Sequence, residues 1–278
     1  MLEELPVPEK PTDIVLEKSG IGRNDRTLKF TNTLPVSLKQ NESIEAAVYK
    51  IIESGHRSIP IVSENGQLAG IIASGDILVF VVNSFLQNGS FKDPVETIMT
   101  RDIIFAESED PIVLTIQKMK ATKRGRIPVL SGGKLTGMIS EYDVVKYFAN
   151  TRLGIPVSEI MTRKPLFVTP DISVFDAVRT FTNTKYRRLP VVENGTVTGI
   201  ITASDILKYL RNTGFKESEL FHPLDELMKK KIFTVENNND ISEAVRMMLV
   251  NSVSGILVVN NEELEGIITE RDVLNNII

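Results

Sequence analysis

The sequence contains no cysteine, which excludes disulfide bonds, thiolate catalysis and cysteine-ligated zinc. It contains only two histidines, His56 and His222, and they lie far apart in the chain. A histidine-rich metal site is therefore not expected, and we interpret each histidine as a surface or packing residue. The sequence also shows no Ser-His-Asp, paired-carboxylate or metal constellation in a credible spacing, so we predict no catalytic residue.

The sequence also lacks an excess of positive charge and a long apolar run. The formal net charge of -4 provides no global basic field for nucleic acid. The longest apolar stretch runs from Ile77 to Val82, far short of the ~20 residues needed to span a bilayer. The first residues, Met1 to Pro6, have neither the basic nor the apolar region of a secretory signal. We therefore expect a soluble cytoplasmic protein that has neither a membrane nor a nucleic acid as partner.

The sequence does contain an internal repeat, because glycine and aspartate recur six positions apart in four segments. These segments are Gly70–Asp76, Gly137–Asp143, Gly199–Asp205 and Gly266–Asp272. The intervals between the four aspartates are 67, 62 and 67 residues, so copies one and three are 129 residues apart, as are copies two and four. This period indicates that a module of two copies was itself duplicated.

Other residues keep the same register. Met99, Met161 and Met228 each lie 44 positions before the aspartates of copies two, three and four. Pro128 and Pro190 each lie 15 positions before the aspartate of their own copy. Agreement at several fixed offsets is not expected by chance, so we predict four homologous units.

The periodicity of the third copy predicts the structure of one unit. Strands are predicted over Leu166–Val168, Arg188–Val192 and Val197–Ile201, with a hairpin turn between the last two. Helices are predicted over Val174–Phe181 and Asp205–Leu210. The resulting order is strand, helix, strand, strand, helix in about 60 residues. Such a small unit buries little core by itself, so pairing of units is expected.

These patterns divide the chain into an N-terminal arm and four units. The arm covers residues 1–30, and the units cover residues 31–90, 91–152, 153–214 and 215–278. Pro6, Pro8 and Pro11 argue against a helix at the start, so we expect an extended arm with a packing role.

The unit with the pattern Gly-h-h-Thr-x-x-Asp, where h is apolar, resembles the cystathionine-β-synthase (CBS) domain. So do Ile98-Met99-Thr100, Ile160-Met161-Thr162 and the Arg188–Val192 strand. The resemblance covers roughly residues 31 to 278. It implies an α/β (α+β) fold in which units one and two, and units three and four, pair through their sheets into two pseudo-twofold Bateman modules. The two modules would form a flat disc within the chain, or the chain would form a homodimer.

The resemblance also implies a ligand class, because such clefts commonly hold AMP, ADP, ATP, or S-adenosylmethionine and relatives such as methylthioadenosine. The aspartates that end the motifs would bind the ribose hydroxyls: Asp76, Asp143, Asp205 and Asp272. The hydroxyls three residues earlier would bind phosphate: Ser140, Thr202 and Thr269. The basic residues before the proline-containing strands would also bind phosphate: Arg57, Arg126, Arg187 and Arg188.

Physical chemistry is compatible with these roles and with a simpler one. A carboxylate can accept hydrogen bonds from both vicinal hydroxyls of a ribose, a helix start attracts anions, and arginine supplies permanent planar charge. The same Thr-x-x-Asp pattern, however, is typical of a helix N-cap with an acid at the third helical position. Four copies do not decide between the two interpretations, since all four helices need caps.

The copies differ in their candidate ligand residues. Copy one has Ala73 in place of the hydroxyl, and copy four has Ser-Val-Ser-Gly at residues 252–255 in place of arginine. The fourth cleft would therefore depend on Arg187 and Arg188 of copy three. We expect copy three to be the best site, followed by copies four and two, and then copy one. Lys229–Lys231 is interpreted as a solvated turn.

The leading hypothesis is a non-catalytic sensor that binds AMP, ADP or ATP and signals to a separate effector protein by a shift in module packing. No catalytic cofactor is expected. A binder of S-adenosylmethionine or methylthioadenosine and an interaction scaffold with empty clefts are the alternatives. An enzyme acting on a bound nucleotide is disfavoured, because no general base or metal set is evident.

Overall fold

The computed structural model describes residues 16–33, 35–87, 89–261 and 263–277. The predicted α/β fold class is confirmed, since the units repeat one order of elements. Unit one contains β1 (Leu38–Lys39), α2 (Ile44–Ser54), β2 (Ser58–Val62), β3 (Leu68–Ala73) and α3 (Ser74–Gln87). Unit two contains β4 (Ala106–Glu107), α4 (Ile112–Thr122), β5 (Arg126–Ser131), β6 (Lys134–Ser140) and α5 (Glu141–Val145).

The second half of the chain repeats this order. Unit three contains α7 (Val174–Thr184), β8 (Arg188–Glu193), β9 (Thr196–Thr202) and α8 (Ala203–Asn212). Unit four contains β10 (Thr234–Glu236), α9 (Ile241–Val250), β11 (Gly255–Asn260), β12 (Glu263–Thr269) and α10 (Glu270–Ile277). The strand predicted over Leu166–Val168 is reduced to one parallel bridge between Val168 and Val191.

Short elements connect the units. They are η1 (Thr27–Phe30), η2 (Val95–Thr97), η3 (Lys146–Phe148), α6 (Val157–Ile160), β7 (Thr162–Arg163), η4 (Glu217–Phe221) and η5 (Leu224–Glu226). Residues 1–15 of the predicted extended arm lie outside the described residues. The described part of the arm is not extended throughout, because residues 16–18 and 27–30 are helical, and it packs against units two and four, where Leu16, Ile21 and Phe30 join the apolar core.

Local sequence explains why each unit folds in this way. Ser173 caps α7 by accepting a hydrogen bond from the backbone N–H of Asp176 at 3.0 Å. The apolar side chains of α7 recur at helical spacing and are buried: Val174, Ala177, Val178 and Phe181. The helix ends at Lys185, whose φ of 57° is left-handed. The hairpin that follows turns at Asn194 and Gly195, both with positive φ, as the predicted tight turn requires.

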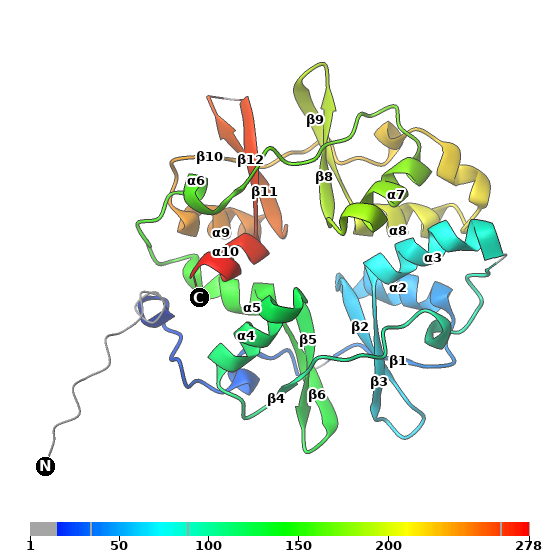
Figure 1. The fold of residues 1–278 in the computed structure, drawn as a ribbon, viewed down its shortest axis with the longest axis horizontal. Helices are drawn as coiled ribbons and strands as arrows, with labels where there is room; N and C mark the ends of the chain where they lie inside the picture. The colour runs from blue at the N-terminus through cyan, green and yellow to red at the C-terminus, as the bar shows by residue number, and fades with distance from the viewer. Residues whose placement is uncertain (1–15, 34, 88, 262, 278) are drawn as a thin grey trace, which may run out of the picture.

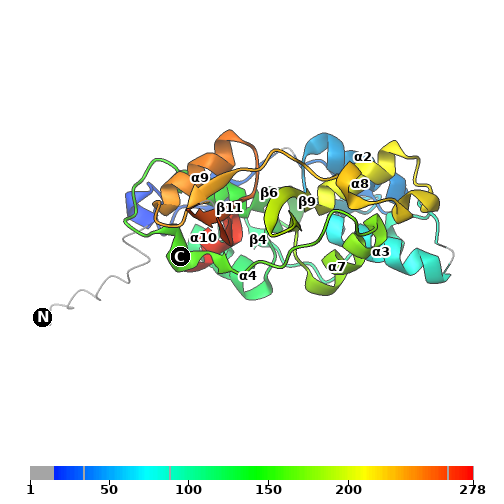
Figure 2. The same cartoon turned by 90° about the horizontal axis from the view of Figure 1, so that it is seen from above.

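The four units lie around one centre and form a flat disc within a single chain (Figures 1 and 2). Helices α2 and α3 of unit one pack against α7 and α8 of unit three, and α5 of unit two packs against α10 of unit four. The apolar core is accordingly divided into one cluster from units one and three and another that joins units two and four. The main apolar contacts between units therefore run between the two modules.

Within each module, the segment that enters one unit lies on the third strand of its partner. Strand β7, at the entry to unit three, pairs with β12 of unit four. Residues at the entries to units one, two and four make the equivalent backbone bridges: Asn32 with Met138, Thr100 with Ile71, and Lys229 with Ile200. This exchange ties the partners of each module together.

The exchange explains why the repeat combines glycine with methionine. A Cβ atom at Gly266 would lie 2.6 Å from Sδ of Met161, and one at Gly199 would lie 2.7 Å from Sδ of Met228. Each methionine therefore packs on the glycine of the partner unit, where only glycine leaves room. Spacing within one copy could not reveal this contact, because it joins two copies.

Among the described residues, no helix is both long enough and apolar enough to cross a membrane.

Candidate functional site

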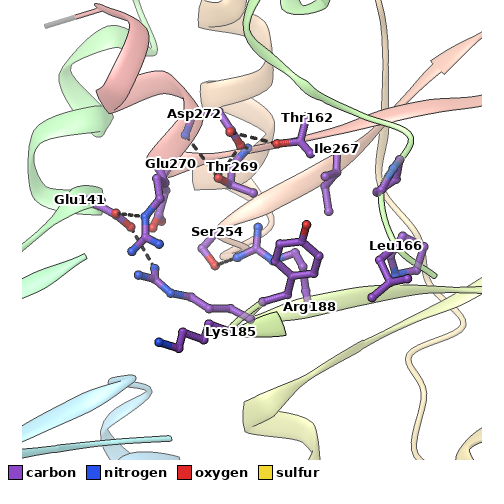
Figure 3. Close-up of a pocket in the computed structure, with 15 residues that line it drawn as sticks. Glu141, Thr162, Leu166, Lys185, Arg188, Ser254, Ile267, Thr269, Glu270 and Asp272 are labelled. Atoms are coloured by element: carbon purple, nitrogen blue, oxygen red, sulfur yellow. Dashed lines mark hydrogen bonds and ion pairs between the residues drawn. The ribbon is translucent and has the colours of Figure 1, made fainter. Parts of the chain in front are cut away.

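A pocket of about 190 Å³ lies between units three and four (Figure 3). Its basic residues are Lys185, Arg187, Arg188 and Arg271. Its apolar wall includes Leu166, Tyr186, Pro190 and Ile267. Thr269 and Asp272, the motif residues of unit four, also line the pocket, together with Thr162 and Ser254.

Thr269 and Asp272 form a helix cap at the junction of β12 and α10. The backbone N–H and the hydroxyl of Thr269 both donate to Oδ2 of Asp272, at 2.8 and 2.6 Å. The other oxygen, Oδ1, accepts a longer hydrogen bond of 3.3 Å from the hydroxyl of Thr162 (Figure 3). Burial raises the pKa of Asp272 above its ordinary value. Oδ2 of Asp272 thus caps α10, and Oδ1 accepts a hydrogen bond from one neutral donor at the pocket, the hydroxyl of Thr162.

In the other units, the motif aspartate also accepts a hydrogen bond at the start of the following helix. The hydroxyls of Ser140 and Thr202 donate to Asp143 and Asp205 at 2.5 and 2.6 Å. In unit one, the backbone N–H of Ala73 donates to Asp76 at 2.7 Å. The aspartate thus accepts a backbone hydrogen bond at the helix start in all four units and a hydroxyl bond in units two, three and four, so the rest of each cleft must distinguish a binding site from a plain cap.

Arg188 has a guanidinium whose hydrogen-bonding groups are only partly satisfied by the described residues. Its Nη2 donates to the hydroxyl of Ser254, whereas its Nη1 is buried without a hydrogen-bond partner among the described residues. The side chain lies over Gly255, where a Cβ atom would overlap the guanidinium. Burial lowers the pKa of Arg188 to about 10, which leaves the group charged at neutral pH. A buried and unpaired guanidinium N–H is costly, and an anion would satisfy it.

Buried ion pairs connect this pocket to the centre of the disc. Glu141 of unit two accepts hydrogen bonds from Arg187 at 3.0 Å and from Arg271 at 2.9 Å. Glu270 of unit four accepts one from Arg57 of unit one at 2.8 Å. The two glutamate side chains are only 4% and 5% exposed. Burial alone would raise the pKa of Glu141, but Arg187 and Arg271 hold it below its ordinary value.

The CBS domain model matches four segments of the chain, residues 30–83, 95–150, 157–212 and 224–278. The chain belongs to the CBS domain family. Two of its relatives are uncharacterized archaeal proteins. A 33.4 kDa protein in the ribosomal RNA operon of Thermofilum pendens is 28% identical over 246 residues, covering 80% of each chain. MJ1225 of Methanocaldococcus jannaschii is 27% identical over 273 residues, covering 90% of this chain and 98% of MJ1225.

A solved structure supports the same assignment. The crystal structure of MJ1225 superposes with a TM-score of 0.83 and 26% identity, covering 91% of this chain and all of that one. MJ1225 is described there as a candidate archaeal homologue of γ-AMPK. The arrangement of all four CBS units is therefore shared by the two proteins.

Partner CBS units share the candidate residues of the second module. Arg187 and Arg188 lie with Thr269 and Asp272 of unit four. Lys229 Nζ, from the entry segment of unit four, instead contacts Oδ1 of Asp205 at 2.8 Å. The expected dependence of the fourth cleft on unit three thus has a geometric basis, and the arginines expected for the third motif line the pocket of the fourth.

In the first module, Asp143 has basic neighbours from units one and two. The charge of Asp143 acts on both His56 and Arg126, so these residues of units one and two approach one another. Burial lowers the pKa of Arg126 to about 10, and its Nη1, like that of Arg188, is a buried atom without a partner in the described ranges. Asp76 lies near Arg124, and burial raises the pKa of Asp76.

Sequence reasoning missed Glu141 and Glu270. Each is the first residue of the helix that follows the motif, in α5 and α10. The signal was present, because only copies two and four have glutamate directly after the motif hydroxyl, whereas Ser74 and Ala203 stand there in copies one and three. The long-range pairing of these glutamates could not be read from one copy.

Proposed function

We propose that this CBS protein is a non-catalytic sensor that binds an adenine nucleotide between units three and four and signals to a separate effector protein. The observation that carries the proposal is the unpaired Nη1 of Arg188 in a pocket that also contains Asp272. A phosphate would satisfy the guanidinium and a ribose would satisfy the carboxylate. The two groups therefore match the two polar ends of a nucleotide.

Each part of the ligand has a proposed partner. Arg187 and Arg188 would hold the phosphate, and Thr269 would turn its hydroxyl from Asp272 toward it. Oδ1 of Asp272 would exchange the 3.3 Å bond from Thr162 for the ribose hydroxyls. Leu166, Tyr186 and Ile267 would pack against the base, because they form the apolar wall of the same pocket.

The remaining candidate residues keep their proposed roles in the other clefts. Asp143 with Ser140, Arg57 and Arg126 would form a second nucleotide site in the first module. The sequence ranks copy three first, but Asp205 with Thr202 is proposed as a weaker ribose site, as is Asp76. In the Asp205 cleft Lys229 already holds the carboxylate, and in the first unit Ala73 provides no hydroxyl.

The basic end of the pocket favours AMP, ADP or ATP over S-adenosylmethionine. A phosphate brings negative charge to Arg187 and Arg188, whereas the sulfonium of S-adenosylmethionine brings positive charge near the same guanidiniums. The description of MJ1225 as a candidate homologue of γ-AMPK agrees with a role in energy sensing. The pocket volume of about 190 Å³ is below the ~300–1,000 Å³ of pockets that enclose whole ligands, so part of the nucleotide would stay visible to an effector.

A thermal-shift screen against AMP, ADP, ATP and S-adenosylmethionine tests the proposal. A ligand at 100 times its Kd stabilises a fold by about 2.7 kcal/mol, which is readily detected as a rise in Tm. We expect a rise with one or more of the nucleotides. No shift with any of the four compounds, together with no nucleotide detected by mass spectrometry of the purified protein, would favour the scaffold with empty clefts.

A further inference from the structure

We propose that Glu141 and Glu270 are positioning residues that make nucleotide binding in the Asp143 and Asp272 clefts mutually antagonistic. The inference rests on the proposed nucleotide binding and concerns its regulation. Each glutamate lies two positions before the aspartate of its own unit and binds an arginine that we assign to the other cleft, and Glu141 also lines the Asp272 pocket itself.

The exchange of partners is reciprocal. Glu141 begins α5 beside Asp143, yet it binds Arg187, which lines the Asp272 pocket, at 3.0 Å. Glu270 begins α10 beside Asp272, yet it binds Arg57 of unit one at 2.8 Å. Arg57 is placed in the first module as Arg187 is in the second, since each lies three positions before the proline of its strand.

The arrangement is specific to two of the four clefts. The positions of Glu141 and Glu270 are occupied by Ser74 and Ala203 in units one and three. The positions of Arg57 and Arg187 are occupied by Gly125 and Ser254 in units two and four. The reciprocal pairs therefore follow the twofold relation of the duplicated module and connect only the clefts of Asp143 and Asp272.

Burial makes these pairs energetically important. The side chains of Glu141 and Glu270 are 4% and 5% exposed, so a carboxylate that loses its guanidinium is not compensated by water. A phosphate in the Asp143 cleft that draws Arg57 toward itself leaves Glu270 without that partner. Glu270 lines the Asp272 pocket, so the loss of its hydrogen-bonded guanidinium leaves more of its negative charge to disfavour a second phosphate there, while Arg126 and Arg188 still act on it through space.

A phosphate in the Asp272 cleft would affect Glu141 in the corresponding way. A phosphate in the Asp272 cleft that draws Arg187 leaves Glu141 with Arg271, which remains bonded at 2.9 Å. Glu141 therefore keeps a hydrogen-bonded guanidinium, whereas Glu270 keeps the through-space charges of Arg126 and Arg188, so Glu270 carries the larger share of the antagonism. Because coupling between two sites is reciprocal, either nucleotide weakens the other by the same factor.

Calorimetric titration of the full chain with AMP tests this inference. We expect two binding events, the second about 5- to 150-fold weaker than the first, which is the usual range of coupling between sites. Asp143→Ala and Asp272→Ala should each leave one cleft that binds with the tighter constant, because the competing phosphate is gone. Glu270→Gln should reduce the difference between the two wild-type constants to about threefold or less, whereas Glu243→Gln, an exposed control on α9, should not.

A second variant tests the mechanism without relying on the difference between two constants. In a chain that carries Asp143→Ala, the further change Arg57→Gln should weaken AMP binding in the remote Asp272 cleft, because it removes the guanidinium that is hydrogen-bonded to Glu270. Equal constants for the two wild-type sites, or an unchanged difference in Glu270→Gln, would overturn the inference. No binding of AMP to the wild type or to either single-site variant would instead refute AMP binding itself.

Discussion

The Asp272 and Asp205 clefts of the second module share one motif and differ in their surroundings. In both, the threonine hydroxyl donates to the motif aspartate at 2.6 Å and caps the following helix. Oδ1 of Asp272 receives a neutral hydroxyl from Thr162 at 3.3 Å, whereas Oδ1 of Asp205 is bonded to the ammonium of Lys229 at 2.8 Å. Arg187 and Arg188 of unit three line the Asp272 pocket. Ser254 and Gly255 occupy the matching positions of unit four.

The comparison shows that the motif by itself builds a cap, and that a residue from an exchanged entry segment sets the neighbour of the second aspartate oxygen. Thr162 and Lys229 arrive on the exchanged entry segments, directly after Met161 and Met228. One residue on that segment changes the neighbour of the motif aspartate from a neutral donor to a cation.

The largest expected difference between the clefts concerns their aspartates. Asp272→Ala should weaken AMP binding in its cleft by ~10- to 100-fold, since a hydrogen bond to a charged group contributes about 1.5–3 kcal/mol. Asp205→Ala should change the tight AMP constant less than about threefold, because Lys229 already holds that carboxylate. Calorimetry of both variants measures the contrast, and equal losses would erase the distinction between the two clefts.

The contacts of Met161 with Gly266 and of Met228 with Gly199 should contribute similarly to the stability of the second module. Gly266→Ala and Gly199→Ala each place a Cβ atom within 3 Å of a methionine sulfur, so each should lower the free energy of unfolding by about 1–3 kcal/mol. Gly75→Ala is the matched control, because nothing lies within 4 Å of its Cβ position in α3, and it should be neutral or slightly stabilising. Urea denaturation measures all three, and a silent Gly266→Ala would contradict the packing of Met161 on Gly266.

A smaller gain is expected from Lys229→Thr, which gives the Asp205 cleft the residue found at position 162. The ion pair is half exposed and worth about 0–1 kcal/mol, so the gain in AMP affinity at that cleft should not exceed about fivefold. Calorimetry in a chain that also carries Asp272→Ala isolates this site, with the exposed Lys230→Thr as control. Weaker binding in Lys229→Thr would show that the lysine serves the ligand.

The smallest effect concerns pH. Burial raises the pKa of Asp272, so acidification protonates it earlier than an exposed aspartate and removes the acceptor of the ribose hydroxyls. Affinity for adenosine should therefore fall, by less than about tenfold, between pH 7 and pH 5. Adenosine avoids the titration of a phosphate near pH 6. Asp272→Asn should flatten the profile, and a wild-type affinity that rises on acidification would contradict the role of the carboxylate.

Local structure was predictable because it depends on neighbours in sequence. The spacing of Gly199 and Asp205, the apolar stripe of α7 and the turn at Gly195 all act within one copy, and the structure has the expected elements there. The contact of Met161 with Gly266 and the pair of Arg187 with Glu141 join residues 46 to 105 positions apart. Such contacts depend on which units meet in the disc. Because the four units have similar local sequences, the sequence does not show which unit packs against which.

The most direct test of the central claim is the ratio of AMP affinity to adenosine affinity in Arg188→Met and in the wild type. If Arg188 binds the phosphate in the pocket of Asp272, the variant should bind AMP ~10- to 100-fold more weakly while its affinity for adenosine is unchanged. An equal loss for both compounds, or no loss for either, would contradict the assignment of this pocket as a nucleotide site.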